Sequence, residues 1–154
     1  ASIKKYFWFN SIGYVPQKIY LFDESIEYNI TLQKTNDVDK IYLNTILEIC
    51  QLKDFINSLP EKTNAIVGET GDNISGGQKQ RIGIARALYR NPQIIVLDEA
   101  TNSLDLKTEQ KLINHLNNKF KDRSIITISH KKIEENNFDK IYLIDKGNLT
   151  QTKS

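Results

Sequence analysis

The chain has 154 residues, of which 39% are hydrophobic and 26% are charged, and this composition is typical of one folded domain. Its formal net charge is only +2 at pH 7. This small positive charge gives no indication that nucleic acid or an anionic membrane is a partner. No run approaches the roughly 20 apolar residues of a membrane helix, and the first residues lack the apolar segment of a signal peptide.

The cysteine content favours a reducing compartment. Cys50 is the single cysteine of the sequence, and one cysteine cannot form an internal disulfide. Because Cys50 follows Ile46, Leu47 and Ile49 in an apolar helical pattern, we expect a small buried side chain rather than a reactive thiol.

The first half of the chain is predicted to form one short strand and then a helical stretch. Residues 12–15 form the strand, which ends at Pro16. Apolar residues at helical spacing then predict three helices, over 24–30, 38–49 and 51–58. This stretch stops at residues 57–60, and the polar, glycine-containing residues 61–75 are predicted to form a loop.

The second half of the chain alternates between helices and strands. A helix over about 76–90 is closed by Asn91-Pro92, and a short apolar strand follows over 94–97. The remaining predicted elements are a helix over 106–119, strands over 124–129 and 140–144, a turn over 145–148 and a last short strand. This alternation predicts an α/β fold with a mainly parallel sheet and helices on its faces.

Four polar residues follow three of the predicted strands. Gln17 comes after the first strand, Asp98 and Glu99 come after the strand that ends at Leu97, and His130 comes after the next. Because the carboxyl ends of parallel strands meet at one edge of a sheet, where ligands bind, we expect these side chains to converge. Each of them taken alone is also compatible with a solvated loop residue.

Residues Ser75-Gly76-Gly77-Gln78 open the helix predicted over 76–90. Glycine lets backbone N–H groups approach a ligand closely, and a helix N-terminus favours negative charge, so the sequence predicts a phosphate site. Taken by itself, however, a Ser-Gly-Gly sequence is better explained as the N-cap of a helix that follows a loop.

The longer sequence context carries a family resemblance. Residues 74–105, ISGGQKQRIGIARALYRNPQIIVLDEATNSLD, resemble the signature, Walker B and D-loop motifs of ABC ATPases. Tyr14-Val15-Pro16-Gln17 resembles the Q-loop, and His130 resembles the switch histidine. The resemblance runs from about Ile12 to Lys146, and three further segments are similar to those of ABC exporters, namely residues 21–26, 55–60 and 67–71.

The resemblance implies a role for each residue at the predicted sheet edge. Asp98 would hold Mg²⁺ through water, and Glu99 would polarise the attacking water as the general base. His130 would contact the γ-phosphate of ATP. Gln17 would reach both Mg²⁺ and the attacking water, and its loop would couple the site to a membrane domain.

The resemblance also implies partners. The signature residues Ser75, Gly76, Gly77 and Gln78 would bind ATP that is held by a second ABC domain in a head-to-tail dimer. Asp105, in a variant of the usual Ser-Ala-Leu-Asp motif, would act at the dimer interface. The other partner would be the transmembrane domain of the transporter, and no nucleic acid is expected. We expect the remaining histidine, His115, to be a solvated surface residue without a role.

The resemblance defines a partial ATP-binding domain over residues 1–154. Residues 11–17 and 92–154 would belong to the catalytic core of a P-loop NTPase-like fold, and residues 18–91 to an inserted helical subdomain. The P-loop pattern G-x-x-x-x-G-K-[ST], or Walker A, occurs nowhere in the sequence, and in this family it lies upstream of the Q-loop. We therefore expect the chain alone to bind Mg-ATP weakly and to hydrolyse it negligibly.

An incomplete sheet would leave an open edge, which favours dimerisation or aggregation. The aromatic residues 6–9 are expected to pack where the missing strands belong, or else to mediate association.

Three functional hypotheses follow. The first is the ATP-binding domain of an ABC exporter, cytosolic itself and placed at the cytoplasmic face of the inner or plasma membrane. The second is a soluble ABC-type ATPase that acts on nucleic acid or ribosomes, against which the exporter-like segments and the small net charge argue. The third is a non-catalytic fragment that docks to a partner, a hypothesis that the missing P-loop keeps open.

Overall fold

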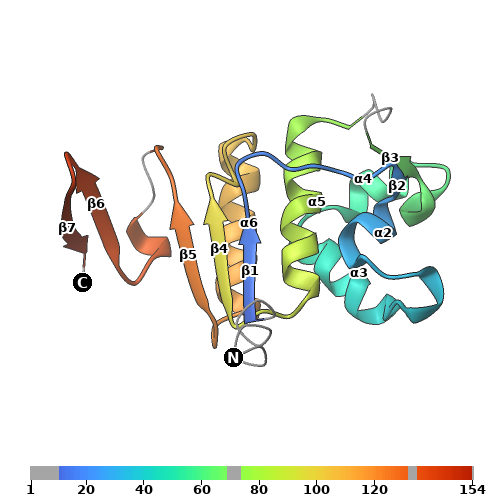
Figure 1. The fold of residues 1–154 in the computed structure, drawn as a ribbon, viewed down its shortest axis with the longest axis horizontal. Helices are drawn as coiled ribbons and strands as arrows, with labels where there is room; N and C mark the ends of the chain where they lie inside the picture. The colour runs from blue at the N-terminus through green and yellow to red at the C-terminus, as the bar shows by residue number, and fades with distance from the viewer. Residues whose placement is uncertain (1–10, 69–73, 132–134, 154) are drawn as a thin grey trace, which may run out of the picture.

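A parallel sheet of three strands forms the centre of the molecule. The computed structural model describes residues 11–68, 74–131 and 135–153. Within them, β1 (Ile12–Val15), β4 (Ile94–Asp98) and β5 (Ser124–Ile128) lie in the order β1-β4-β5 (Figure 1). Val15 pairs with Leu97, and Asp98 pairs with Ile128, so the three strands end at the same edge. The predicted α/β fold with a parallel sheet is therefore confirmed.

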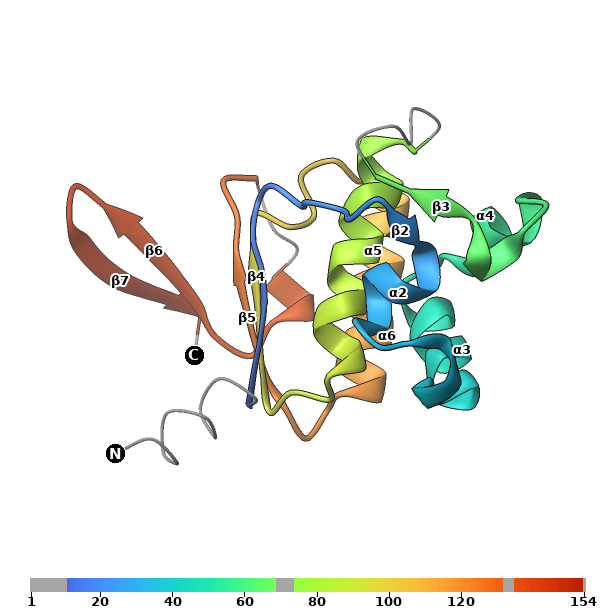
Figure 2. The same cartoon turned by 45° about the vertical axis from the view of Figure 1, so that its right-hand side comes forward.

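The two helices of the second half pack on the sheet. Figure 2 shows α5 (Gly76–Tyr89) and α6 (Leu106–Lys119) on the same side of the three strands. Both helices run back from the carboxyl edge, so their first turns lie at the edge where the strands end (Figure 1). This arrangement brings the start of α5, which carries the Ser-Gly-Gly sequence, to the predicted ligand edge.

The shorter helices lie beyond α5, away from the sheet (Figure 2). They are α2 (Ile26–Thr31), α3 (Lys40–Ile49) and α4 (Lys53–Ser58). One hydrophobic cluster includes buried residues of these helices, of α5, of α6 and of the strands, among them Ile30, Ile46, Leu88, Leu97 and Leu116. Because this core is continuous, it does not mark a boundary, and the division into a core and a subdomain at residues 18–91 stays a prediction.

One small sheet was missed by sequence reasoning. β2 (Glu24–Ser25) pairs antiparallel with β3 (Ile66–Val67), although residues 24–25 were predicted as helix and residues 61–75 as loop. Strands of two residues carry no period-2 signal, and their partners are far apart in sequence. Single 3₁₀ turns also occur at Thr35–Asp37, Lys62–Asn64 and Glu135–Asn137.

The last two strands form a separate hairpin. β6 (Ile141–Asp145) and β7 (Asn148–Lys153) pair antiparallel, and Lys146 and Gly147 between them have φ angles of +46° and +80°. Positive φ at both central residues is typical of a two-residue hairpin turn. The expected strand and turn are thus present, although the hairpin does not join the parallel sheet among the described residues.

β5, one of the two outer strands of the parallel sheet, has one unpaired side within the described part of the chain. β5 pairs with β4, and Figure 1 shows the β6–β7 hairpin standing apart from it. Apolar side chains on these strands are exposed, with Ile126 at 50% and Ile144 at 75%.

The described helices include none that is long and apolar enough to cross a membrane. The predicted packing of residues 6–9 lies outside the described residues.

Candidate functional site

The carboxylate of Glu99 is the centre of the site. Gln17 Nε2 donates a hydrogen bond to Oε2 of Glu99 at 2.6 Å, and Asn102 Nδ2 donates to the same oxygen at 2.7 Å. His130 Nε2 lies 2.9 Å from the other oxygen, Oε1. Three segments that are far apart in the chain therefore bind one carboxylate. Gln17, Glu99 and His130 converge as the sequence predicted.

The backbone at Glu99 has a conformation that non-glycine residues seldom adopt. Its φ is +50°, immediately after the last residue of β4. The N–H of Glu99 donates to the carbonyl of Ile128 at 3.0 Å, which continues the sheet past the end of β4. Left-handed backbone at a residue with a side chain costs free energy and is concentrated at functional sites. Here it turns Glu99 away from the strand and toward Gln17 and His130.

Asp98 is bound by a residue of the neighbouring strand. Tyr14 Oη donates to Oδ2 of Asp98 at 2.7 Å. This hydrogen bond is the main reason that the pKa of Tyr14 is raised above its ordinary value, because removing the proton would place two negative oxygens side by side. Tyr14 was not among the predicted site residues, although it stands within the Q-loop sequence.

The Ser-Gly-Gly sequence forms a helix cap. Ser75 Oγ accepts a hydrogen bond from the N–H of Gln78 at 3.2 Å, and Gln78 Oε1 accepts one from the N–H of Ser75 at 2.8 Å. This capping box starts α5, so the structural explanation for the sequence is correct. A cap does not exclude a phosphate site, because it leaves other N–H groups of the first turn without a helical acceptor. The binding role of these four residues stays a prediction.

Gly76 and Gly77 pack against the loop that follows β4. A Cβ on Gly77 would lie 3.2 Å from the carbonyl oxygen of Ser103, and one on Gly76 would lie 3.6 Å from the Ser103 side chain. The close approach of the two backbones therefore favours glycine at position 77 for packing reasons as well.

Asp105 also acts as a helix cap. Its Oδ1 accepts a hydrogen bond from the N–H of Thr108 at 3.0 Å at the start of α6. Hydrogen bonds from the side chain of Thr108 and then from its backbone N–H lower the pKa of the Asp105 carboxyl. The side chain is exposed. The proposed contact of Asp105 with a second domain stays a prediction.

The loop over residues 101–104 is held by a lysine next to His130. Lys131 Nζ donates to the carbonyls of Asn102 at 3.1 Å and Thr101 at 3.4 Å. Thr101 Oγ1 donates to Oε1 of Glu109 on α6 at 2.6 Å. Lys131 and Asn102 were both missed by sequence reasoning. The asparagine in place of the usual serine of the Ser-Ala-Leu-Asp motif was the signal that could have identified Asn102.

The chain is similar in sequence to a known protein family. The family profile described as "ABC transporter" matches residues 3–102 of the chain. The chain belongs to the ABC transporter family. Membership implies that the domain binds ATP. The assignment of Gln17, Glu99 and His130 to the Q-loop, Walker B and switch positions stays a prediction.

Several relatives have export, permease or flippase in their names. A putative export ATP-binding/permease protein of Rickettsia bellii is 43% identical over 136 residues, which are 88% of this chain and 23% of the relative. A multidrug resistance ATP-binding and permease protein of Lactococcus lactis is 38% identical over 143 residues, 93% of this chain and 24% of the relative. A lipid A-core flippase of Pseudoalteromonas translucida is 37% identical over 138 residues, 90% of this chain and 24% of the relative.

A solved structure has the same fold. A bacterial Atm1-family ABC exporter with ATP bound superposes with a TM-score of 0.80 at 34% identity, covering 92% of this chain and 25% of that one. The chain thus spans about a quarter of the length of the relatives that it matches. The prediction of an exporter-type ABC domain is confirmed.

The sequence also predicted the surroundings of two single residues of this ABC domain, Cys50 and His115. Cys50 is fully buried, and burial raises the pKa of its thiol, so it is the inert core residue that was expected. The prediction that His115 is a solvated surface residue was wrong, and the prediction that it has no role stays a prediction. Its ring is half-buried, and Nδ1 lies 3.2 Å from the carbonyl oxygen of Ile49, because α6 packs against the end of α3.

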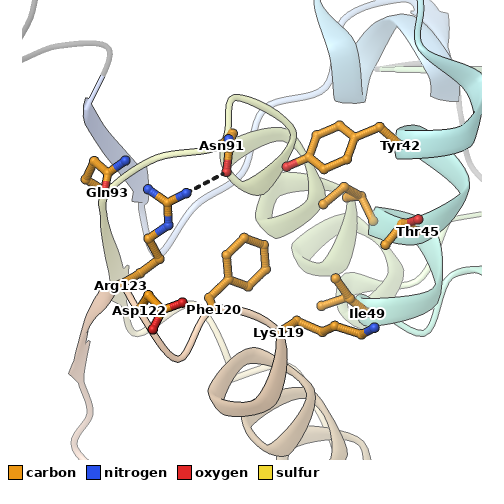
Figure 3. A pocket seen from close by; sticks show the side chains of 10 residues that line it. Tyr42, Thr45, Ile49, Asn91, Gln93, Lys119, Phe120, Asp122 and Arg123 are labelled. Carbon is orange, nitrogen blue, oxygen red and sulfur yellow. Dashed lines mark hydrogen bonds between the residues drawn. The ribbon is translucent and has the colours of Figure 1, made fainter.

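The ABC domain also has a hollow at the opposite edge of the sheet. It has a volume of about 460 Å³ and lies between α3, the loop before β4 and the turn after α6 (Figure 3). Arg123 spans one side and donates to Oδ1 of Asn91 at 3.2 Å, while Phe120 and Tyr42 supply aromatic surface (Figure 3). None of the predicted site residues lines this hollow.

Proposed function

We propose that this chain is part of the ATP-hydrolysing domain of an ABC exporter, and that Glu99 is its general base. The export and permease names of the relatives support the exporter assignment over a soluble ABC ATPase that acts on nucleic acid. The complete protein would then contain a transmembrane domain and couple ATP hydrolysis to export. This domain would lie at the cytoplasmic face of the membrane.

The observation that carries the proposal is the set of donors around Glu99. Amide groups of Gln17 and Asn102 bind one oxygen of its carboxylate, and His130 binds the other. These donors fix the direction of the carboxylate without neutralising it permanently, which suits a base that must hold a water molecule in line with a phosphate. For Glu99 to accept a hydrogen bond from such a water, one of these donors has to move aside.

The residues beside Glu99 carry oxygen atoms of the kind that bind a magnesium ion. Mg²⁺ is bound through one or two carboxylates and otherwise by water and phosphate oxygens. Asp98 supplies a carboxylate at the end of β4, and Gln17 supplies an amide oxygen from the loop after β1. We propose that these two residues hold the ion. When bound, Mg²⁺ would neutralise charge on the phosphates of ATP.

We further propose that two domains are needed for each ATP. The P-loop that would cradle the phosphates does not occur within these 154 residues. Ser75, Gly76, Gly77 and Gln78 would bind ATP held by the P-loop of the second domain, with Asp105 at the interface and His130 at the γ-phosphate. This arrangement predicts that the chain alone is inactive.

Titration calorimetry of the chain with Mg-ATP tests the proposal first, with Glu99→Gln as the comparison. We expect no binding at submillimolar ATP for either protein. Clear binding with steady hydrolysis by the isolated chain would contradict the two-domain arrangement. In the complete protein, Glu99→Gln is expected to lower kcat by about 10² to 10⁴-fold, the range for loss of a general base. Wild-type turnover by that variant would remove Glu99 from the mechanism.

A further inference from the structure

Gln80 lies on the second turn of α5 and is almost completely enclosed, with 5% of its surface exposed. A buried side-chain amide needs partners for both its oxygen and its nitrogen. Gln80 Oε1 accepts a hydrogen bond from the N–H of Ser103 at 2.9 Å, and Nε2 donates to the carbonyl of Gln17 at 3.4 Å. One side chain of α5 therefore holds the backbones of two separate loops.

Each of these two loops supplies an amide that binds Glu99. Gln17 donates through its own side chain to Oε2 of Glu99, and Asn102, the neighbour of Ser103, donates to the same oxygen. The hydrogen bonds form a closed ring from Gln80 through both loops to Glu99. The direction of both donors thus depends on where α5 holds their backbones.

Close packing adds to this connection. A Cβ on Gly77 would lie 3.2 Å from the carbonyl oxygen of Ser103, and a Cβ on Gly83 would lie 2.5 Å from Cδ1 of Ile19. The same helix is therefore in direct contact with the loop after β4 and with the loop after β1. Because packed interiors transmit small displacements, a shift of α5 moves both loops.

We propose that Gln80 is a positioning residue for hydrolysis, which sets from α5 the placement of Gln17 and Asn102 around Glu99. This inference rests on the proposed function of the site. Gln80 does not touch the reacting atoms and acts through the two loops. Ser75 is the N-cap of α5, and the capping turn of the helix is the part proposed to meet the ATP of the second domain. Gln80 thereby links that contact to the Glu99 of its own chain.

The contact itself is tested in the 154-residue chain by amide hydrogen exchange, which does not depend on ATP hydrolysis. We expect the Ser103 amide to be protected in the wild type and in Gln80→Glu, which keeps an acceptor oxygen. In Gln80→Leu, which has a similar size and no acceptor, exchange at Ser103 should be at least about tenfold faster. Equal exchange in the wild type and in Gln80→Leu would overturn the proposal.

The role is tested by steady-state kinetics of the complete protein. Gln80→Leu is expected to lower kcat by about 10- to 100-fold, the usual cost of a misplaced supporting residue, while KM for ATP stays within about twofold. Gln80→Glu should lie between this variant and the wild type. The matched control is Gln51→Leu, which removes the 2.9 Å hydrogen bond from a half-buried glutamine to the carbonyl of Thr108. This hydrogen bond involves neither of the two loops that Gln80 holds.

The unfolding midpoints of both leucine variants separate folding from positioning. A kcat loss in Gln51→Leu equal to that in Gln80→Leu would mean that any loss of packing slows the enzyme, and the proposal would fail.

The double variant Gln80→Leu with Asn102→Ala tests whether the two residues act together. Its fold-loss of kcat should be smaller than the product of the two single losses, because both substitutions act on one donor. Fully multiplicative effects would also overturn the proposal. A complete wild-type protein that lacks ATPase activity would instead overturn the proposed function, while hydrogen exchange still decides the contact.

Discussion

Gln17 and Asn102 donate hydrogen bonds to the same carboxylate oxygen, Oε2 of Glu99, at 2.6 and 2.7 Å. The two amides come from opposite sides of Glu99 in the sequence, one after β1 and one just past β4. Of these, Asn102 stands where the related motif usually has serine. The longer asparagine side chain reaches the carboxylate directly, so this chain holds Glu99 with one more amide than the motif alone would suggest.

Changing Asn102 should therefore affect turnover more than ATP affinity. We expect Asn102→Ala to lower kcat of the complete protein by about tenfold, because Glu99 loses one of the donors that orient it. Asn102→Asp has the same shape but turns an acceptor toward Glu99, so its kcat should fall further. ATP hydrolysis assays with both variants check this order. Equal rates for the two substitutions would show that the donor at position 102 is unimportant.

Arg86 should be important for stability. Its guanidinium donates to the carbonyl and side-chain oxygens of Asn29 at 2.6 and 2.9 Å and to the carbonyl of Tyr20 at 3.0 Å. Arg86→Ala removes all three hydrogen bonds, and among the described residues only the side-chain oxygen of Asn29 keeps another donor, the N–H of Phe22 at 2.8 Å. We therefore expect the free energy of unfolding to fall by about 2–4 kcal/mol. Arg86→Lys keeps the charge but not the fork of donors, so its loss should be smaller. Urea unfolding of the chain measures both, and equal losses would contradict the hydrogen-bond explanation.

Gly83 should not tolerate a side chain. A Cβ at this position would lie 2.5 to 2.9 Å from three side-chain atoms of Ile19. Alanine favours helix more than glycine by about 1 kcal/mol, but overpacking costs about 1–3 kcal/mol, so we expect Gly83→Ala to be destabilising. Combining it with Ile19→Ala removes the crowding atoms. Thermal unfolding should show that Gly83→Ala is harmful beside isoleucine and neutral or favourable beside alanine at position 19.

Cys50 should make stability depend on alkaline pH. Burial raises the pKa of its thiol in the folded chain, so the folded state keeps a proton that the unfolded state releases. This contribution is complete below the unfolded thiol pKa of about 8.5 and decreases as the pH rises above it. Urea unfolding between about pH 7.5 and 9.5 should show a decline that is smaller in Cys50→Ala. A native thiol that reacts with a disulfide reagent as fast as the unfolded chain would contradict the burial of Cys50.

Sequence reasoning predicted the edge at which Gln17, Glu99 and His130 meet, because its position depends on simple geometry. Strands that alternate with helices form a parallel sheet, and Gln17, Glu99 and His130 each follow one of its strands. Their convergence then requires only that the strands end together, as the register shows. The roles of these residues and of Asp98, Ser75 and Asp105 in binding and hydrolysis remain predictions.

The amino-acid sequence by itself determined the α/β class, the family and the residues at the sheet edge, because these depend on local periodicity and on motifs within short stretches. The tertiary structure alone decided which side chains support them. Gln80 and Ser103 are 23 residues apart, and His115 and Ile49 are 66 apart. Such pairs meet only when packing of the helices brings their backbones together, and no local pattern specifies that packing.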